Sequence, residues 1–300
     1  MGLALSGDKM AIASKNEVMV AVNQAQLASQ YPKFPNKYDA LFLPTATYHT
    51  GQVDMHDLHY GEKGRLFAVN TSFSCLTVVN DNFSFTPIWK PEFITEFVCE
   101  DRCHLNGLAM KDGKPKYISA LGTTNTRQGW RENITNGGVI IDIESNQIIA
   151  KGLAMPHSPR VVNGKLYCLL SAAEKLVEIN PETGEVTEVA HIPGFVRGMT
   201  MVQDYAFIAT SKLRQNSSTF KHLKIAQNAD VASIVAVHLP TGAIAGKLTY
   251  LASVDEIYDL LAVPGLKRPN LLNNLNEVHK TGLVTPYGSF WAAPSPEVMQ

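Results

Sequence analysis

The segment that decides the fold is HSPRVVNGKLYCLLSAAEKLVEINPETGEV, residues 157–186. Two apolar runs, HSPRVV and KLYCLL, are separated by Asn163-Gly164, a dipeptide suited to the positive φ angles of tight hairpin turns. A third apolar run, KLVEI, follows and ends in NPETG, a turn of the type expected between outer strands of a small sheet. The segment therefore predicts consecutive antiparallel strands rather than helix.

The same organisation starts at six points along the chain. The apolar starts are MGLAL at Met1, HDLHY at His56, NGLAM at Asn106, HSPRVV at His157, RGMTMV at Arg197 and YDLLAV at Tyr258. Their separations are 55, 50, 51, 40 and 61 residues, which is close to the length of one propeller blade. We therefore predict an all-β fold, a six-bladed β-propeller with about four antiparallel strands per blade, in one domain over residues 1–300.

Closure of the ring and the long loops are the less regular parts of this pattern. After LLAVPGLKRP the sixth unit loses its strand spacing, so we expect its outer strands within residues 271–300, with TGLVTPYGSFW as the best match. A strand from a second subunit is the alternative, which leaves a homo-oligomer open. Long loops at the rim or over one mouth of the channel are expected at Tyr31–Asp39, Thr123–Asn136 and Leu213–Ala229.

Composition and charge restrict the class of protein. A chain of 300 residues with 45% hydrophobic and 18% charged residues is long enough to bury a full core. Lys and Arg number 26 against 27 Asp and Glu, so no cationic field attracts nucleic acid. No apolar run approaches the roughly 20 residues that span a bilayer, and MGLALSGDKM lacks the pattern of a secretion signal. We expect a cytoplasmic protein with neither nucleic acid nor membrane as partner.

Cysteine spacing and phosphate-binding motifs offer no cofactor site. The four cysteines are Cys75, Cys99, Cys103 and Cys168, and the Cys99/Cys103 pair has no second pair to complete a structural zinc site. We interpret all four as free thiols in a reducing compartment. Neither G-x-G-x-x-G nor a Walker-type loop occurs, so we expect no nucleotide cofactor.

Long motifs in a fixed order carry a family resemblance. Between about residues 40 and 272 the chain contains DMHDLHYGEKGRLFAVNTSFSCL, EDRCHLNGLAM, GLAMPHSPRVVNGKLYCLLS, IPGFVRGMTMVQDYAFIATSK and YDLLAVPGLKRPNLL. In this order they resemble a family of bacterial conserved hypothetical proteins, a propeller domain of unknown function that also occurs fused to tetratricopeptide repeats. More loosely, the NGL strand start is similar to six-bladed lactonase and strictosidine-synthase-like propellers, in which an Asn at a strand start can serve a central cation.

Polar residues at the six starts are expected to meet at one mouth of the channel, because the innermost strands of a propeller run along its axis. Period-two alternation gives the same-face pairs Asp54/His56, His104/Asn106, Met155/His157, Phe195/Arg197 and Glu256/Tyr258. Asp57, Arg160 and Asp259 lie beside them. The mouth is therefore predicted to be the functional site, with a small molecule as substrate.

One hypothesis is a metal site with His56, His104 and His157 as ligands. Neutral imidazole binds divalent transition metals such as Zn, Fe or Mn, and Glu256 or Asp57 could complete the shell or orient a ring. A metal with an open position would ionise a bound water or polarise a carbonyl.

A second hypothesis needs no metal. Arg160 and Arg197 carry bidentate donors for a carboxylate or phosphate, and the three histidines serve as general acid or base, tuned by a carboxylate. With Asn106 and Tyr258 as further substrate contacts, the site would suit hydrolase, lyase or isomerase chemistry on a small anionic or carbonyl-containing substrate. Structural alternatives are histidines that only hydrogen-bond at strand ends, and arginines buried in ion pairs, such as Arg197 with Asp259 or Glu256.

A third hypothesis is a binding or scaffold module without catalysis. The loop TTNTRQGWR places Trp130 beside Arg131, the aromatic and cationic content of a surface that contacts a protein, peptide or glycan. The alternative is that Trp130 only covers the rim of the third blade.

Overall fold

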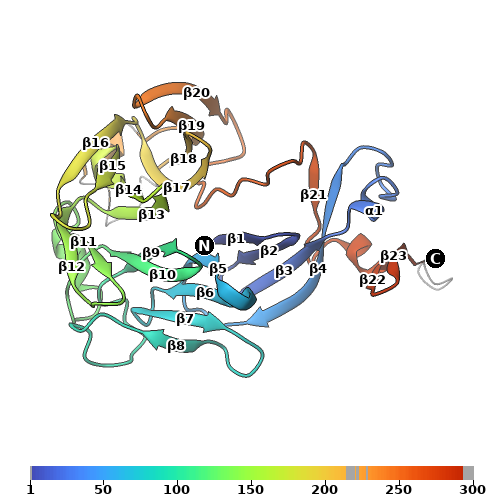
Figure 1. The fold of residues 1–300 in the computed structure, drawn as a ribbon, viewed down its shortest axis with the longest axis horizontal. Helices are drawn as coiled ribbons and strands as arrows, with labels where there is room; N and C mark the ends of the chain where they lie inside the picture. Colours follow the sequence, from blue (N-terminus) through green and yellow to red (C-terminus); the bar gives the residue numbers. More distant parts are fainter. Residues whose placement is uncertain (1, 214–219, 221–222, 228, 293–300) are drawn as a thin grey trace.

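Four-stranded antiparallel sheets repeat along the chain, and their first strands lie side by side around one axis (Figure 1). The structure is a computed structural model that describes residues 2–213, 220, 223–227 and 229–292. Its five blades confirm the all-β propeller fold. The innermost strands are β1, β5, β9, β13 and β17.

The strands of each blade follow chain order from the axis outward. Blade 1 contains β1 (Leu3–Ser6), β2 (Lys9–Ala13), β3 (Glu17–Asn23) and β4 (Ala40–His49); blade 2 contains β5 (Met55–Tyr60), β6 (Leu66–Asn70), β7 (Cys75–Val79) and β8 (Thr86–Trp89). Blade 3 contains β9 (Leu105–Lys111), β10 (Lys114–Ala120), β11 (Gly138–Asp142) and β12 (Ile148–Leu153). Blade 4 contains β13 (Pro156–Val162), β14 (Lys165–Leu170), β15 (Lys175–Ile179) and β16 (Val186–His191); blade 5 contains β17 (Phe195–Val202), β18 (Tyr205–Ser211), β19 (Ser233–His238) and β20 (Ala243–Thr249).

The hairpin turns have the backbone conformation that their residues favour. Asn163 and Gly164 have φ angles of 51° and 79°, and Asp112 and Gly113 have 51° and 72°. Positive φ at both central residues matches the twist of the flanking strands, so the inner hairpins of blades 3 and 4 form where the sequence predicts them.

The hydrophobic core is divided among the interfaces between neighbouring blades. One cluster joins blades 1 and 2 around Ala11 and Leu58, and another joins blades 2 and 3 around Leu76 and Leu108. Two further clusters join blade 3 to blade 4 and blade 4 to blade 5. Because blade 2 is covered by blade 1 on one face and blade 3 on the other, its strand β7 buries successive residues rather than alternate ones.

The predicted sixth blade is wrong, because residues 250–268 contain no strand. An extended segment, 255–262, instead lies between blade 5 and blade 1 (Figure 1). It hydrogen-bonds to Ser211 and to the backbone N–H of Leu3, but the chain then turns through Pro264-Gly265 and leaves the axis. Proline cannot donate to a ladder and glycine weakens a strand, so no sheet grows on this segment.

The C-terminal part does not supply the outer strands expected within residues 271–300. Strand β21 (Pro269–Leu271) pairs in parallel with β4 and enlarges blade 1. Strands β22 (Gly282–Thr285) and β23 (Gly288–Trp291) form a separate hairpin. The Trp291 indole donates to the carbonyl of Leu27 in α1 (Ala25–Ala28), so the hairpin lies against blade 1. Residues 293–300 of this prediction lie outside the described part.

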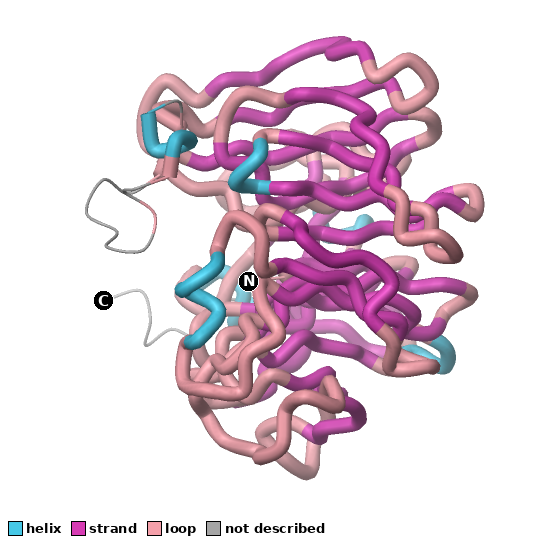
Figure 2. The backbone as a smooth tube through the Cα atoms, turned by 90° about the vertical axis from the view of Figure 1, so that its left-hand side faces the viewer, coloured by secondary structure: helices cyan, strands magenta, loops and turns pink. Residues whose placement is uncertain are grey.

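The helical turns are short and occur in the connections (Figure 2). They are η1 (Glu62–Gly64), η2 (Gly129–Asn133), η3 (Ser171–Ala173), η4 (Lys224–Gln227) and η5 (Glu277–Thr281). Two of the predicted loops, Thr123–Asn136 and Leu213–Ala229, pack together in a cluster that includes Trp130, Phe195 and Ile225. Residues 214–219, 221, 222 and 228 of the second loop lie outside the described part. None of the described helices is long and apolar enough to cross a membrane.

Candidate functional site

Alternating glycine and polar residues hold the innermost segments close together. A Cβ atom on Gly107 would lie 2.5 Å from the ring of Pro159, and one on Gly198 would lie 2.4 Å from the Cα of Asp259. The polar members bond to the next segment: Asp57 accepts from the N–H of Leu108 at 2.9 Å. Asp259 accepts from the N–H of Leu3 at 2.9 Å, and the Ser158 hydroxyl donates to the carbonyl of Arg197 at 2.8 Å. The extended segment 255–262 therefore repeats the contacts of an innermost strand.

The residues directly before Asp57, Gly107, Ser158, Gly198 and Asp259 contribute five side chains to a cavity at the channel mouth. They are His56, Asn106, His157, Arg197 and Tyr258, and the cavity also touches Asp57, Gly107, Ser158 and Asp259. The volume of this cavity is only about 10 Å³. That is room for roughly one water molecule, so the mouth is narrow.

His56 and His157 are held by equivalent partners, in each case a backbone carbonyl two residues earlier and a side-chain hydroxyl. The Nδ1 atom of His56 lies 3.2 Å from the carbonyl of Asp54 and 2.8 Å from the hydroxyl of Thr71. The Nδ1 atom of His157 lies 3.0 Å from the carbonyl of Met155 and 2.8 Å from the hydroxyl of Ser171.

The hydroxyl groups assign the tautomer of both rings. The Thr71 hydroxyl donates to the carbonyl of Leu105 at 2.6 Å, and the Ser171 hydroxyl donates to the carbonyl of Val196. Since a carbonyl can only accept and each hydroxyl has used its hydrogen, Nδ1 must carry the proton. Within the described residues the Nε2 atoms of His56 and His157 have no hydrogen-bond partner, so each offers a lone pair.

Burial keeps both imidazoles neutral. Burial and the charge of Arg197 lower the pKa of His157 to about 3. Burial and the neighbouring His104 hold the pKa of His56 well below its usual range. At neutral pH both rings are therefore hydrogen-bond acceptors, bases or ligands through Nε2, and neither is a cation.

Beneath the mouth, Arg160 is enclosed by two carboxylates. Its guanidinium lies 3.0 Å from Asp57 and 3.9 Å from Asp259, and it also donates to the carbonyl of Leu108. Although burial opposes ionisation, Arg160 lowers the pKa of Asp57, whereas burial and the charge of Asp57 raise the pKa of Asp259 to about 6. Arg160 therefore forms buried ion pairs between innermost segments, which is the structural role considered above as an alternative for the arginines.

Arg197 reaches the cavity from blade 5. Its guanidinium lies 4.1 Å from the centre of the Tyr258 ring, and its Nη1 atom lies 3.7 Å from a carboxylate oxygen of Glu256. Burial and a hydrogen bond to Glu256 raise the pKa of Tyr258. This arrangement leaves a cation at the wall of the cavity with its charge partly balanced by Glu256.

His104 lies beside the cavity rather than in its wall. Its Nδ1 atom is 2.9 Å from a carboxylate oxygen of Asp101, which also accepts from the Trp130 indole at 3.0 Å. The His104 ring lies 4.3 Å from the Trp130 ring and 5.0 Å from the His56 ring, measured between centres.

In blades 2, 3 and 4 a left-handed residue before the first strand explains which member of a predicted same-face pair lines the cavity. Asp54, His104 and Met155 have φ angles of 50°, 50° and 58°. Such a residue interrupts the alternation of a strand, so it does not point in the direction of the residue two positions later. The second member of each pair, such as His56 or Asn106, faces the cavity instead.

The structure thus gathers seven of the predicted site residues around one cavity: His56, His157, Tyr258, Asn106, Arg197, Asp57 and Asp259. The other predicted site residues do not line it: His104, Glu256, Arg160, Trp130 and Arg131. Within the described part of the chain, no three or more His, Cys, Asp or Glu side chains are close enough to hold a metal ion. The three histidines predicted as ligands therefore do not form such a group in this conformation.

The hydroxyl groups that orient the histidines, those of Thr71 and Ser171, are functional residues that were not predicted from the sequence. Thr71 follows His56 by 15 residues and Ser171 follows His157 by 14. Aligning the units on their strand starts would have shown a hydroxyl residue at this distance in both blades. The buried thiols are not nucleophiles, because burial raises the pKa of Cys75, Cys103 and Cys168 to about 12.

Comparison with known proteins identifies the family. Residues 1–272 match the family described as Domain of unknown function (DUF4915). The chain belongs to this family. No curated protein matches the chain. Among solved structures, the computationally designed Ika8 protein is similar with a TM-score of 0.43 at 10% sequence identity, and the match covers 88% of this chain and 65% of that chain. The chain therefore spans about two thirds of the length of Ika8.

Proposed function

We propose that this chain is an enzyme of hydrolase, lyase or isomerase type that acts on a small anionic or carbonyl-containing substrate at the channel mouth. One observation carries the proposal. Two neutral imidazoles, His56 and His157, line the same cavity and are each anchored through Nδ1, which leaves Nε2 as the basic atom. A fixed ring with a free lone pair is the arrangement that a general base requires.

Donors for a substrate oxygen lie in the same cavity. The side-chain amide nitrogen of Asn106 is buried and has no hydrogen-bond partner in the described residues. An unpaired buried donor is costly, so an acceptor is expected to occupy the space in front of it. A carbonyl or carboxylate oxygen that accepts from Asn106 and lies near Arg197 would be stabilised as negative charge develops on it.

Substrate binding would adjust the basicity of the histidines. The charge of Arg197 contributes to the low pKa of His157. An anionic group bound beside Arg197 offsets that charge and raises the pKa of His157 toward neutrality, where general-base catalysis is most effective. The small volume of the cavity admits only the reacting group or one water, while the rest of the substrate lies outside the mouth.

A metal-dependent version requires a further ligand. The Nε2 atoms of His56 and His157 suit Zn, Fe or Mn, and each Nδ1–H already bonds to a backbone carbonyl, as in many metal sites. Two imidazoles alone do not fix such an ion, and His104 bonds through Nδ1 to Asp101. We therefore propose acid–base chemistry without a metal. Near-stoichiometric transition metal in protein purified without chelator, lost in the His56→Ala/His157→Ala variant, would replace this version with the metal-dependent one.

The binding-module alternative has less support. Trp130 is 3% exposed and its indole bonds to Asp101, so it is not presented to a protein, peptide or glycan. The Arg131 guanidinium lies 4.7 Å from the Trp130 ring centre. These contacts favour the alternative in which Trp130 covers the rim of blade 3.

The test is a panel of small substrates assayed with matched histidine variants. Pyruvate and other 2-oxo acids would be followed by NMR for hydrogen exchange in D₂O, and small esters and lactones for hydrolysis. We expect at least one activity, reduced about 100-fold or more by His56→Ala or His157→Ala. His191→Ala, on the exposed end of β16, is the control and should retain it. Equal rates in all variants, or no turnover across the panel, would contradict the proposal.

A further inference from the structure

Grooves lie between neighbouring blades at the end of the molecule opposite the channel mouth, beside the turns of the inner hairpins. The grooves between blades 1 and 2, 2 and 3, and 4 and 5 have volumes of about 470, 720 and 510 Å³. These volumes fall in the range of small-molecule sites. The three grooves are equivalent in the fold, so differences in their side chains indicate different ligands.

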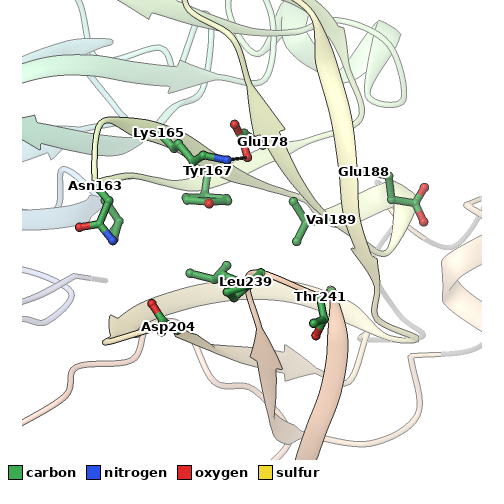
Figure 3. A pocket seen from close by; sticks show the side chains of 12 residues that line it. Asn163, Lys165, Tyr167, Glu178, Glu188, Val189, Asp204, Leu239 and Thr241 are labelled. Atoms are coloured by element: carbon green, nitrogen blue, oxygen red, sulfur yellow. Dashed lines mark hydrogen bonds and ion pairs between the residues drawn. The ribbon is translucent and has the colours of Figure 1, made fainter.

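The groove between blades 4 and 5 is acidic (Figure 3). Its wall contains Glu178, Glu188 and Asp204, while Lys165 is its basic residue. Lys165 pairs with Glu178 at 2.9 Å, as the dashed line in Figure 3 marks. Lys175, outside the lining, pairs with Glu188 at 2.6 Å, so Asp204 gives the excess negative charge of this groove.

The groove between blades 2 and 3 has the opposite charge. Its wall contains Lys63, Arg65 and Lys114, with Glu62 as its acidic residue. None of the three cationic side chains has a carboxylate within 4.0 Å in the described part of the chain. Lys114 and Lys165 have equivalent positions in their own blades, because both follow an Asx-Gly turn and begin the second strand. Lys114 lies on the second blade of the basic groove, and Lys165 lies on the first blade of the acidic groove.

The floor of this basic groove is apolar and contains one unsatisfied donor. Phe67, Leu76 and Ile143 line it together with Trp89. The indole Nε1 of Trp89 is buried and has no hydrogen-bond partner within the described residues. A buried N–H without an acceptor destabilises the protein, and a ligand oxygen that accepts from it would remove that cost.

We propose that the groove between blades 2 and 3 binds a small aromatic anion. Its planar body packs against Trp89 and Phe67, and one oxygen of its anionic group accepts from the Trp89 indole. Lys63, Arg65 and Lys114 neutralise the charge. This site is separate from the channel mouth and does not depend on the proposed enzymatic function.

Naphthalene-1-sulfonate is a suitable probe, with 1-naphthol as its neutral counterpart, and calorimetry measures both. We expect the sulfonate to bind at least 10-fold more tightly than the naphthol. Lys114→Glu should weaken sulfonate binding at least 10-fold and leave naphthol binding nearly unchanged. Trp89→Phe, which keeps the aromatic wall and removes the N–H, should weaken the sulfonate about 3- to 10-fold.

The matched control is Lys165→Glu, which makes the same charge change at the equivalent turn of blade 4, beside the acidic groove, and should leave sulfonate binding unchanged. His157→Ala tests the channel mouth and should also have no effect. Equal weakening by Lys114→Glu and Lys165→Glu would show a nonspecific charge effect and overturn the proposal. Loss of binding in His157→Ala, or no binding of the sulfonate at millimolar concentration, would overturn it as well.

Discussion

His56 and His157 are held by hydroxyl groups that serve two purposes at once. Each hydroxyl accepts from a histidine Nδ1 and donates to a backbone carbonyl at the start of the next blade. The orientation of the imidazole therefore depends on correct packing between two blades. The coupling comes from the connection after the second strand, which holds Thr71 and Ser171, and it repeats in blades 2 and 4.

The low pKa of His157 predicts a pH-dependent stability. Its pKa is about 3 in the folded protein, against about 6.5 in an unfolded chain. Between these values the unfolded state binds the extra proton, so the free energy of unfolding must decrease as pH falls from about 6.5 to 3. His157→Gln should reduce the slope by up to about 1.4 kcal/mol per pH unit in this range, measured by urea unfolding.

The control for this prediction is NMR of the histidine ring nitrogens. The His157 signals should remain those of the neutral ring with the proton on Nδ1 from pH 8 to pH 5. Titration of His157 with a midpoint near 6.5, or identical slopes for the wild-type protein and His157→Gln, would contradict the account.

At the scale of elements, segment 255–262 completes the ring that the five blades leave open. Asp259 accepts from the N–H groups of Leu260 and Leu3, just as Asp57 accepts from those of Leu58 and Leu108. One extended segment thus takes the position of an innermost strand without a sheet behind it. The contact between blade 5 and blade 1 depends on its side chains.

Asp259→Ala should therefore be among the most destabilising single changes in the chain. It removes the acceptor for two N–H groups and one of the carboxylates around the buried Arg160, with an expected loss of about 3 kcal/mol. Asp255→Ala is the matched control on the same segment. The Asp255 side chain is 80% exposed, so its loss should change stability by no more than about 0.5 kcal/mol. Similar unfolding midpoints for the two variants would show that the segment does not close the ring.

The positions of the hairpin turns could be predicted from the sequence, whereas the directions of the side chains at the strand starts could not. The turns at Asn163-Gly164 and Asp112-Gly113 follow from residues that tolerate positive φ. His104 has positive φ without being a residue that requires it. It contacts Asp101, three residues earlier, and Trp130, which is distant in the sequence. Alternation alone therefore placed His104 with Asn106 on one face.

For the whole molecule, the number of innermost segments and the number of blades are separate quantities. Each strand start has a glycine or a small polar residue that allows the innermost segments to approach closely at the axis. The start at Tyr258 has such a residue as well, Asp259. A blade also needs second, third and fourth strands, which depend on the residues that follow. The repeated starts predicted six units, while the turn at Pro264-Gly265 after Tyr258 left the sixth without a sheet.

Deletion of the C-terminal hairpin tests whether segment 255–262 closes the ring without a sixth blade. Strands β22 and β23 lie against blade 1, and none of the five blade sheets includes them. Removal of residues 282–300 exposes Leu43 and Leu27, which the hairpin contacts, and should lower the unfolding temperature modestly. The far-UV circular dichroism of the sheets and a single cooperative transition should persist, because the contacts of Asp259 with Leu3 remain. If the truncated protein instead loses its sheet signal at 25 °C, the hairpin is required for the ring, and closure by segment 255–262 alone is wrong.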